Sequence, residues 1–239
     1  MPTAATAAPG LRVRPWHRDR GVAFLSPAPG RRPRVEDIRA CIDALPAAGY
    51  DGVVTPALDR AEQAPFLAAG LDVLEDLHLF HHDLDRLPEP RPVTGVRLRR
   101  GRRRDIGPVT DIDHLAFTSP FWHLGPEGLR ETIAATPSHR FRVAWAGGDP
   151  IGYSVVGRSG RWSYLQRVAV HPETQGRGVG RGLVIDAVRW SARRRCRQLL
   201  VNTQLDNTTA VGLYESLGFV RSRFGLAVLQ SGLRPTVAP

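Results

Sequence analysis

The sequence contains no lysine, and all 33 of its basic residues are arginine. Together with 24 glycines and 20 prolines, this composition is typical of a GC-rich coding bias, so the formal net charge of +10 is weak evidence for a nucleic-acid partner. The densest basic run, residues 97–104 (RLRRGRRR), has the charge to contact phosphates, but its alternation with Val96 and Leu98 favours an edge strand and turn with a solvated face. No interleaved aromatic residues are available to stack bases. We therefore expect no nucleic-acid partner.

Cysteine is almost absent as well. Cys41 and Cys196 lie far apart, each inside an apolar run, which favours buried free thiols over a disulfide or a metal site. The one histidine cluster, His78, His81 and His82, has no cysteine at ligand spacing, so we expect a surface cluster and no metal. No run reaches the ~18 apolar residues of a membrane span, and the first ten residues lack the layout of a secretory signal. These absences predict a cytoplasmic protein without a membrane partner.

Glycine, by contrast, is concentrated in the loop that follows a predicted apolar strand at residues 164–171. The loop that follows leads into a helix whose apolar side is marked by Val184, Ala187, Val188 and Ser191. Glycine lets the backbone approach a ligand closely, and the N–H groups at a helix start favour phosphate. A merely flexible turn is the alternative interpretation. The loop residues are Gln175, Gly176, Arg177, Gly178, Val179, Gly180 and Arg181.

The segment after this helix repeats the alternation of strand and helix. An apolar run at residues 198–203 precedes residues 207–219 (NTTAVGLYESLGF), in which one helical face carries Ala210, Leu213, Tyr214 and Leu217 before Gly218 closes the helix. Residues 93–230 resemble the GCN5-related N-acetyltransferase (GNAT) superfamily. Gln175, Gly178 and Gly180 match its Gln/Arg-x-x-Gly-x-Gly/Ala signature, and the Asn-to-Gly-Phe stretch looks like its second signature.

The resemblance implies a mixed α/β fold and transfer of an acetyl group from acetyl-CoA, a cosubstrate, to a primary amine. It implies that the main chain at Val168, Ala169 and Val170 pairs with the pantetheine arm and that residues 175–181 bind the pyrophosphate. Asn207 would lie near the pantetheine and also cap the next helix. Tyr214 stands where the family places the acid that protonates the leaving thiolate. A role for Tyr214 in the core beside Leu213 and Leu217 stays open.

The general base is not apparent from the sequence. Branches of the family carry a glutamate at positions that correspond here to Tyr164 or Asn202, and neither residue is acidic. Glu173 and His171, beside the loop, are fallback candidates, although a glutamate after His-Pro is commonly a charge at a helix start. A water relay is the remaining alternative. The amine acceptor, the acyl chain length and the oligomeric state, with a homodimer as one option, stay open.

The N-terminal part of the chain resembles a degenerate copy of the C-terminal domain. Residues 1–15 predict a loose leader, and residues 87–92 (LPEPRP) predict a linker between a partial GNAT-like module at 1–92 and a catalytic GNAT domain at 93–239. Pro29, Arg32 and Arg34 stand where Gln175, Gly178 and Gly180 stand in the second copy, so we expect the first copy to bind no cofactor. An offset of 146 residues aligns Val22, Gly30, Arg31, Ile38, Ile42, Val53, Val54 and Ala64 with Val168, Gly176, Arg177, Val184, Val188, Leu199, Leu200 and Ala210.

Charge divides the chain in the same place. Residues 35–92 hold four arginines and twelve acids, a net of −8, whereas residues from 93 onward hold 22 arginines and ten acids, a net of +12. Opposite fields favour docking of the two halves. They also leave a non-catalytic acetyl-CoA-binding sensor open as an alternative, with the acidic half as its output.

Overall fold

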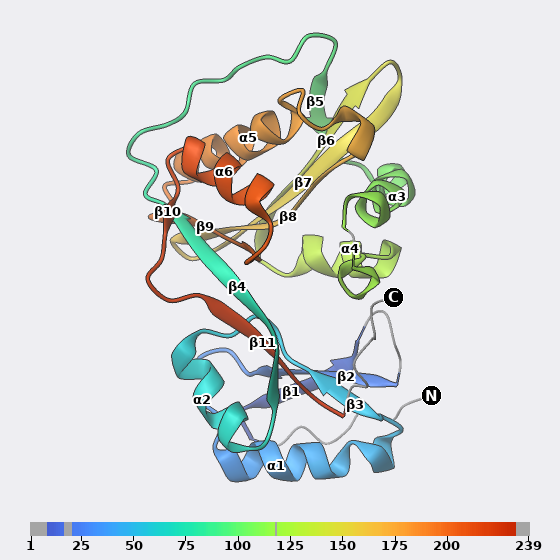
Figure 1. Ribbon diagram of the computed structural model, residues 1–239, viewed down its shortest axis with the longest axis vertical. Helices are drawn as coiled ribbons and strands as arrows, with labels where there is room; N and C mark the ends of the chain where they lie inside the picture. The colour runs from blue at the N-terminus through green and yellow to red at the C-terminus, as the bar shows by residue number, and fades with distance from the viewer. Residues whose placement is uncertain (1–8, 17–20, 118, 233–239) are drawn as a thin grey trace. The chain divides into compact units, whose positions relative to one another are not determined.

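The computed structural model describes residues 9–16, 21–117 and 119–232, which form two compact units (Figure 1). The first unit comprises the described residues up to 79, residues 202–206 and residues 222–232. The second comprises residues 80–201 and 207–221. Strands β4 (Asp72–His82) and β9 (Gln198–Gln204) contribute residues to both. Residues 80–92 therefore pack with the second unit, although the functional division at residue 92 stays a prediction.

The first unit is a mixed sheet covered by two helices. Its strands lie in the order β1–β2–β3–β11–β4, with β2 and β3 parallel and the other neighbours antiparallel. Leu25, Ile38, Phe66 and Leu229 are fully buried in one apolar cluster between the sheet and the helices. Besides β4, the elements are β1 (Leu11–Pro15), β2 (Val22–Pro27), α1 (Val35–Ala44), η1 (Pro46–Ala48), β3 (Gly52–Val54), α2 (Arg60–Ala68) and β11 (Leu226–Ser231).

Local sequence accounts for most of this unit, with two exceptions. Helix α2 begins with a capping box in which the Asp59 side chain accepts from Glu62 N at 2.9 Å, and the helix is followed by Gly70 at φ +100°. The expected loose leader is wrong for Leu11–Pro15, because these residues form β1 and pair with β2. Residues 1–8 of that leader lie outside the described part. Strand β11 was not predicted, and it inserts between β3 and β4 through backbone pairing that leaves little local signal.

The second unit is a sheet with helices on both faces (Figure 1). Strands β5–β6–β7–β8 pair antiparallel in that order, β8 and β9 pair in parallel, and β10 pairs with the end of β4. The elements are β5 (Arg97–Arg100), η2 (Arg103–Asp105), α3 (Ile106–Ala116), η3 (Pro120–Trp122), α4 (Pro126–Ala134), β6 (Ser138–Ala146), β7 (Asp149–Ser159), β8 (Trp162–Val170), η4 (Pro172–Thr174), α5 (Val179–Arg193), α6 (Thr208–Ser216) and β10 (Val220–Arg221).

Strand alternation separates the two faces. Tyr153, Val155 and Ala169 pack with α3 on one side, whereas Val168 and Val170 pack with Val179 and Leu183 of α5 on the other. The α5 stripe predicted from the sequence, Val184, Ala187, Val188 and Ser191, is fully buried. Cys41 and Cys196 are buried free thiols, as expected. The predicted first strand at 93–99 begins later, since β5 starts at Arg97 and a turn closed by Val96 N to Val93 O precedes it.

Both units share one succession of elements. Strand β2, helix α1 and parallel strand β3 correspond to β8, α5 and β9, and each copy has a left-handed glycine in the loop after its first strand: Gly30 at φ +70° and Gly176 at φ +73°. The first loop differs in its chemistry. Pro27, Pro29 and Pro33 provide no N–H donors there, and no glycine stands at the start of α1. The fold is thus a GNAT-like α/β domain preceded by a partial copy whose anion loop is degenerate.

Candidate functional site

The site begins where two parallel strands diverge. Strands β8 and β9 pair only at Trp162–Gln198, Ser163–Leu199 and Tyr164–Leu200, while β8 continues to Val170. A register shift between β7 and β8 makes Gln166 an extra residue, and such a bulge bends the strand that carries it. The backbone edge of β8 beyond Tyr164 is therefore available to an extended ligand. Val168, Ala169 and Val170, predicted from the resemblance, lie on this open part.

The end of β8 leads directly into the glycine loop. Gly178 is the N-cap of α5 at φ +85°, a conformation that side chains rarely adopt. The first intrahelical donor is Gly182 N, which bonds Gly178 O at 2.9 Å, so the N–H groups of Val179, Gly180 and Arg181 are not used inside the helix. A Cβ at Gly180 would lie 3.5 Å from Val170 Cγ2, an ordinary contact. These amides form a cradle suited to a pyrophosphate.

Two side chains of the loop make contacts within the protein. Gln175 Nε2 donates to Val170 O at 3.1 Å and ties the loop to the end of β8. Arg181 Nη1 donates to Ser216 Oγ at 2.8 Å, so its guanidinium reaches toward the end of α6. Arg177 is exposed. The structure therefore brings the predicted loop residues together, with Gln175 and Arg181 as anchors of the loop.

Asn207 and Tyr214 lie on the segment after β9. Asn207 is the N-cap of α6, where its Oδ1 accepts from Ala210 N at 3.0 Å. Tyr214 is only 3% exposed, and its ring centroid lies 5.8 Å from that of Phe80 and 5.5 Å from that of Phe219. Burial raises the pKa of the Tyr214 phenol well above its ordinary value. The phenol is therefore held in its protonated form, and its ring is part of the core.

The candidate bases are less distinctive. Tyr164 is 37% exposed, and partial burial raises its pKa. His171 Nδ1 accepts weakly from Glu173 N at 3.4 Å, and the Glu173 side chain is exposed. Asn202 is exposed on the part of β9 that belongs to the first unit. None of these residues is a buried carboxylate, so the structure supplies no strong base at the positions expected from the resemblance.

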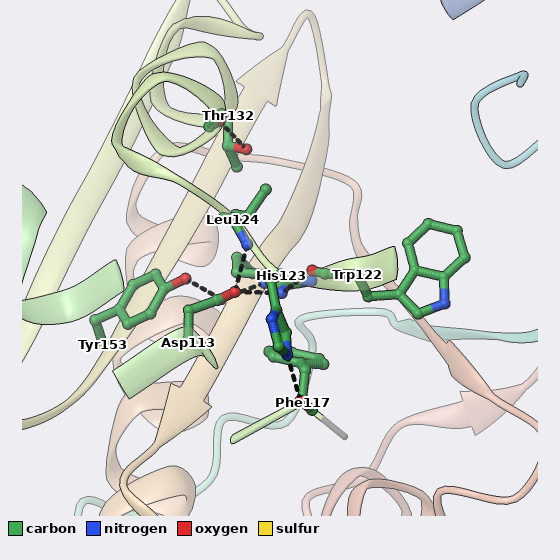
Figure 2. Close-up of polar contacts among 9 residues, drawn as sticks. Asp113, Phe117, Trp122, His123, Leu124, Thr132 and Tyr153 are labelled. Atoms are coloured by element: carbon green, nitrogen blue, oxygen red, sulfur yellow. Dashed lines mark hydrogen bonds and ion pairs between the residues drawn. The ribbon is translucent and has the colours of Figure 1, made fainter. Parts of the chain in front are cut away.

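A buried ionic network that the sequence analysis did not anticipate lies on the α3 face of the sheet (Figure 2). Asp113 is fully buried and accepts from Tyr153 Oη at 2.5 Å and Leu124 N at 2.7 Å. Arg167 binds the same carboxylate with Nε and Nη2, both at 2.7 Å. Burial and the Asp113 charge raise the pKa of Tyr153, so its hydroxyl stays a donor. The carboxylate thus accepts from strands β7 and β8 and from the connecting segment before α4.

The network fixes the segment between α3 and α4. Arg167 Nη2 donates to Trp122 O at 2.6 Å, and the guanidinium carbon lies 3.5 Å from the ring centroid of Phe117. His123 contacts Phe117 O at 2.7 Å (Figure 2). Arg167 is adjacent to Val168, so the open part of β8 and the α3–α4 segment are coupled through one side chain. The available signals were an aspartate among the apolar residues of α3 and an arginine inside an apolar strand.

Another buried titratable group, His82, packs against Phe219, which also contacts Tyr214. His82 is 3% exposed, its Nδ1 accepts from Leu84 N at 2.9 Å, and its ring packs edge-on against Phe219 at 5.1 Å. Burial lowers the pKa of His82 despite the opposing charges of Asp85 and Asp83; the nearby His81 also lowers it. The histidine is therefore a neutral member of the core, contrary to the expected surface cluster.

Two absences concern the described residues only. No group of three or more His, Cys, Asp or Glu side chains is placed to hold a metal ion in the part of the chain that the structure describes. Among the same residues, no helix is long and apolar enough to cross a bilayer.

Comparison with known proteins agrees with this geometry. The chain is 31% identical over 176 residues to a mycothiol acetyltransferase of Amycolatopsis mediterranei, covering 65% of this chain and 57% of that protein. It is 27% identical to a mycothiol acetyltransferase of Nocardia farcinica, covering 91% of this chain and 77% of the relative. The chain thus spans little more than half the length of the first of these relatives.

Solved structures share the fold across both units. A tandem GNAT protein from the clavulanic acid biosynthesis pathway superposes with a TM-score of 0.65 at 17% identity, over 88% of this chain and 75% of that chain. A GCN5-related N-acetyltransferase from Sphaerobacter thermophilus gives 0.63 at 15% identity, over 95% and 77%. Residues 109–219, which include the network, the diverging strands, the glycine loop and Tyr214, match the model of the acetyltransferase (GNAT) family. Through this region, the chain is similar to the GNAT family.

Proposed function

We propose that the second unit transfers the acetyl group of acetyl-CoA to a primary amine. The observation that carries the proposal is the sequence of features along β8: pairing with β9 stops at Tyr164, the strand continues to Val170, and the amide cradle follows at Gly178 to Arg181. An extended thioester arm beside the open strand would end in a pyrophosphate at the cradle. The first unit lacks this cradle, so we propose one acetyl-CoA per chain.

In the proposed reaction, the amine nitrogen attacks the thioester carbonyl carbon, and the tetrahedral intermediate expels coenzyme A as a thiolate while the ammonium loses a proton to water. Tyr214 is proposed to stabilise the thiolate. Because burial raises its pKa above that of an ordinary thiol at ~8.5, hydrogen-bond donation is favoured over full proton transfer. The α3–α4 segment held by Asp113 and Arg167 is proposed to form the acceptor side.

Without a buried carboxylate base at the expected positions, the range of amines that the proposed enzyme can acetylate at pH 7 is restricted. At pH 7 a lysine-type amine with a pKa of ~10.4 is neutral in about one molecule in 2,500, whereas an α-amine with a pKa of ~7.8 is neutral in about one in seven. We therefore propose weakly basic amines as acceptors, either small molecules or peptide α-amines. The names of the relatives favour a small molecule, so the amine that mycothiol acetyltransferases use belongs in the panel.

The test is release of free thiol from acetyl-CoA with a panel of amines and peptides at pH 7. The proposal requires thiol release that depends on the amine, with a higher kcat/KM for weakly basic amines than for lysine side chains. A clear preference for lysine would contradict the inferred absence of a base. If none of the acceptors gives amine-dependent thiol release, the proposal of catalysis loses its support.

Cofactor binding is tested separately at Gly180, where a Cβ makes only ordinary contacts. Gly180→Glu places a carboxylate against the pyrophosphate and should reduce acetyl-CoA affinity at least 100-fold, whereas Gly180→Gln, of the same size, should lose much less. Calorimetry measures both affinities and the stoichiometry. Equal affinities of the two variants would show that no anion lies at the cradle. Gly178→Glu is a poorer test, because φ +85° adds backbone strain to the charge effect.

One observation favours a second candidate function, a non-catalytic acetyl-CoA sensor. Tyr214 is buried between Phe80 and Phe219, an environment that also suits a purely structural ring. A sensor would bind acetyl-CoA at the same cradle without releasing thiol. Stoichiometric binding without amine-dependent turnover would support the sensor, and turnover would exclude it.

A further inference from the structure

The second unit contains a strongly basic cavity, here called the arginine cavity, with a volume of about 570 Å³. Residues of β5, η2, α3, α4, β6 and α5 line it. The end of β5 and the following turn contribute Arg100, Arg102 and Arg103, and α4 contributes Arg130. Its lining also includes Arg140 and Arg142 of β6 and Arg194 after α5. Seven arginines thus line one cavity, and none of the described residues that line it is acidic.

The cavity is only partly neutralised. Asp186 binds Arg140 through Nε at 2.6 Å and Nη2 at 2.8 Å, and it lies 3.3 Å from Arg142 Nη2. This hydrogen bonding raises the pKa of Arg140. Within the described part of the chain, no carboxylate lies within 4.0 Å of the other five guanidinium groups, those of Arg100, Arg102, Arg103, Arg130 and Arg194. Among the described residues, Asp186 is thus the one carboxylate within 4.0 Å of any of these seven guanidinium groups.

The backbone holds these charges close together. Arg100 on β5 lies directly opposite Arg142 on β6, and like charges in such a pair destabilise a sheet. The Nε atom of Arg142 is buried and has no hydrogen-bond partner among the described residues. Next to Arg100, a Cβ at Gly101 would lie 2.2 Å from the Phe141 ring, so this turn is packed tightly onto the core. The backbone positions of Arg100 and Arg142 are thus fixed by a tightly packed part of the sheet.

We propose that the arginine cavity binds a small multivalent anion of the phosphate class, at a site separate from the acetyl-CoA cradle and beyond the proposed transferase function. Planar guanidinium groups bind phosphate oxygens in pairs, and the volume lies in the range of small-molecule sites. Trp190 lines the cavity twelve residues after Gly178, roughly 18 Å along α5. Extended nucleic acid is disfavoured, because Phe141 and Trp190 are only 7% and 5% exposed and offer no open ring for stacking.

The test is a titration of the whole chain with tripolyphosphate, followed by calorimetry and by thermal unfolding. We expect one tripolyphosphate per chain in the Gly180→Glu variant, whose amide cradle is blocked, with a higher Tm in the presence of the anion and weaker binding as salt rises. The variant Arg102→Gln/Arg103→Gln/Arg130→Gln should bind at least ten-fold more weakly. Its Tm without anion should equal or exceed that of the parent, because repulsion is removed. The single variant Arg130→Glu provides an independent second test.

A matched control removes the same charge elsewhere. Arg12→Gln/Arg104→Gln/Arg161→Gln changes three exposed arginines that do not line the cavity, so its affinity should stay within two-fold of the parent. Equal losses in both triple variants, or no loss in either cavity variant, would overturn the proposal. Gly180→Glu, which blocks the amide cradle, should still bind tripolyphosphate at the arginine cavity; loss of this binding would overturn the separation of the two sites. Tighter binding of a single-stranded 12-mer than of tripolyphosphate, lost in the cavity variant, would replace the small anion with nucleic acid.

Discussion

Removal of the Asp113 carboxylate should be among the most damaging single changes in the second unit. Asp113→Asn leaves the Arg167 guanidinium, whose side chain is 14% exposed, without its counter-charge. One amide oxygen must then replace two carboxylate oxygens that together accept from Tyr153, Leu124 and Arg167. Breaking a buried ion pair from one side costs about 3–5 kcal/mol. At roughly 2–4 °C per kcal/mol for a chain of this size, Tm should fall by about 6–20 °C.

The assay is urea and thermal unfolding of the variant beside Asp111→Asn, an exposed aspartate on the same helix that should change stability by less than about 0.5 kcal/mol. The double variant Asp113→Asn/Arg167→Met removes the unpaired charge and should be more stable than Asp113→Asn alone. A loss below about 1 kcal/mol for Asp113→Asn, or a double variant as unstable as the sum of both singles, would refute the assignment of a coupled buried pair.

Three further changes test other parts of the structure. Tyr214→Phe should fold normally and bind acetyl-CoA but lose about 100-fold in kcat, and an unchanged kcat would make Tyr214 structural. Because burial lowers the pKa of His82 in the folded chain, His82 binds a proton more readily in the unfolded chain. The urea midpoint should therefore fall as the pH drops below ~6.5, and it should fall less in His82→Asn. A fragment of residues 93–239 loses Phe80, fully buried beside Tyr214, and should be insoluble; a soluble, active fragment would contradict this.

The elements of the second unit were largely predictable because their signals are local. The α5 stripe and the left-handed glycine at 178 each follow from spacing within a few residues, so the loop and helix are found where the pattern indicated. Strand β11 was missed because backbone pairing with the distant strands β3 and β4 stabilises it, and β1 was missed because only Leu11 of its five residues is buried, which leaves a weak apolar pattern. The Asp113–Arg167 pair was missed because 54 residues separate its members.

The arginines show where composition stops being informative. A coding bias that places arginine at every basic position weakens each arginine equally as evidence for a binding site. Their surroundings in the structure, however, differ. Arg99 pairs with Asp105 at 2.8 Å, and Arg167 pairs with Asp113, so both are neutralised parts of the fold. Arg100, one residue from Arg99 and on the opposite face of β5, instead lies opposite Arg142 and has no carboxylate within 4.0 Å of its guanidinium among the described residues. Repulsion of that kind destabilises the fold unless an anion offsets it, so the positions of unpaired arginines, and not their number, indicate where a ligand binds.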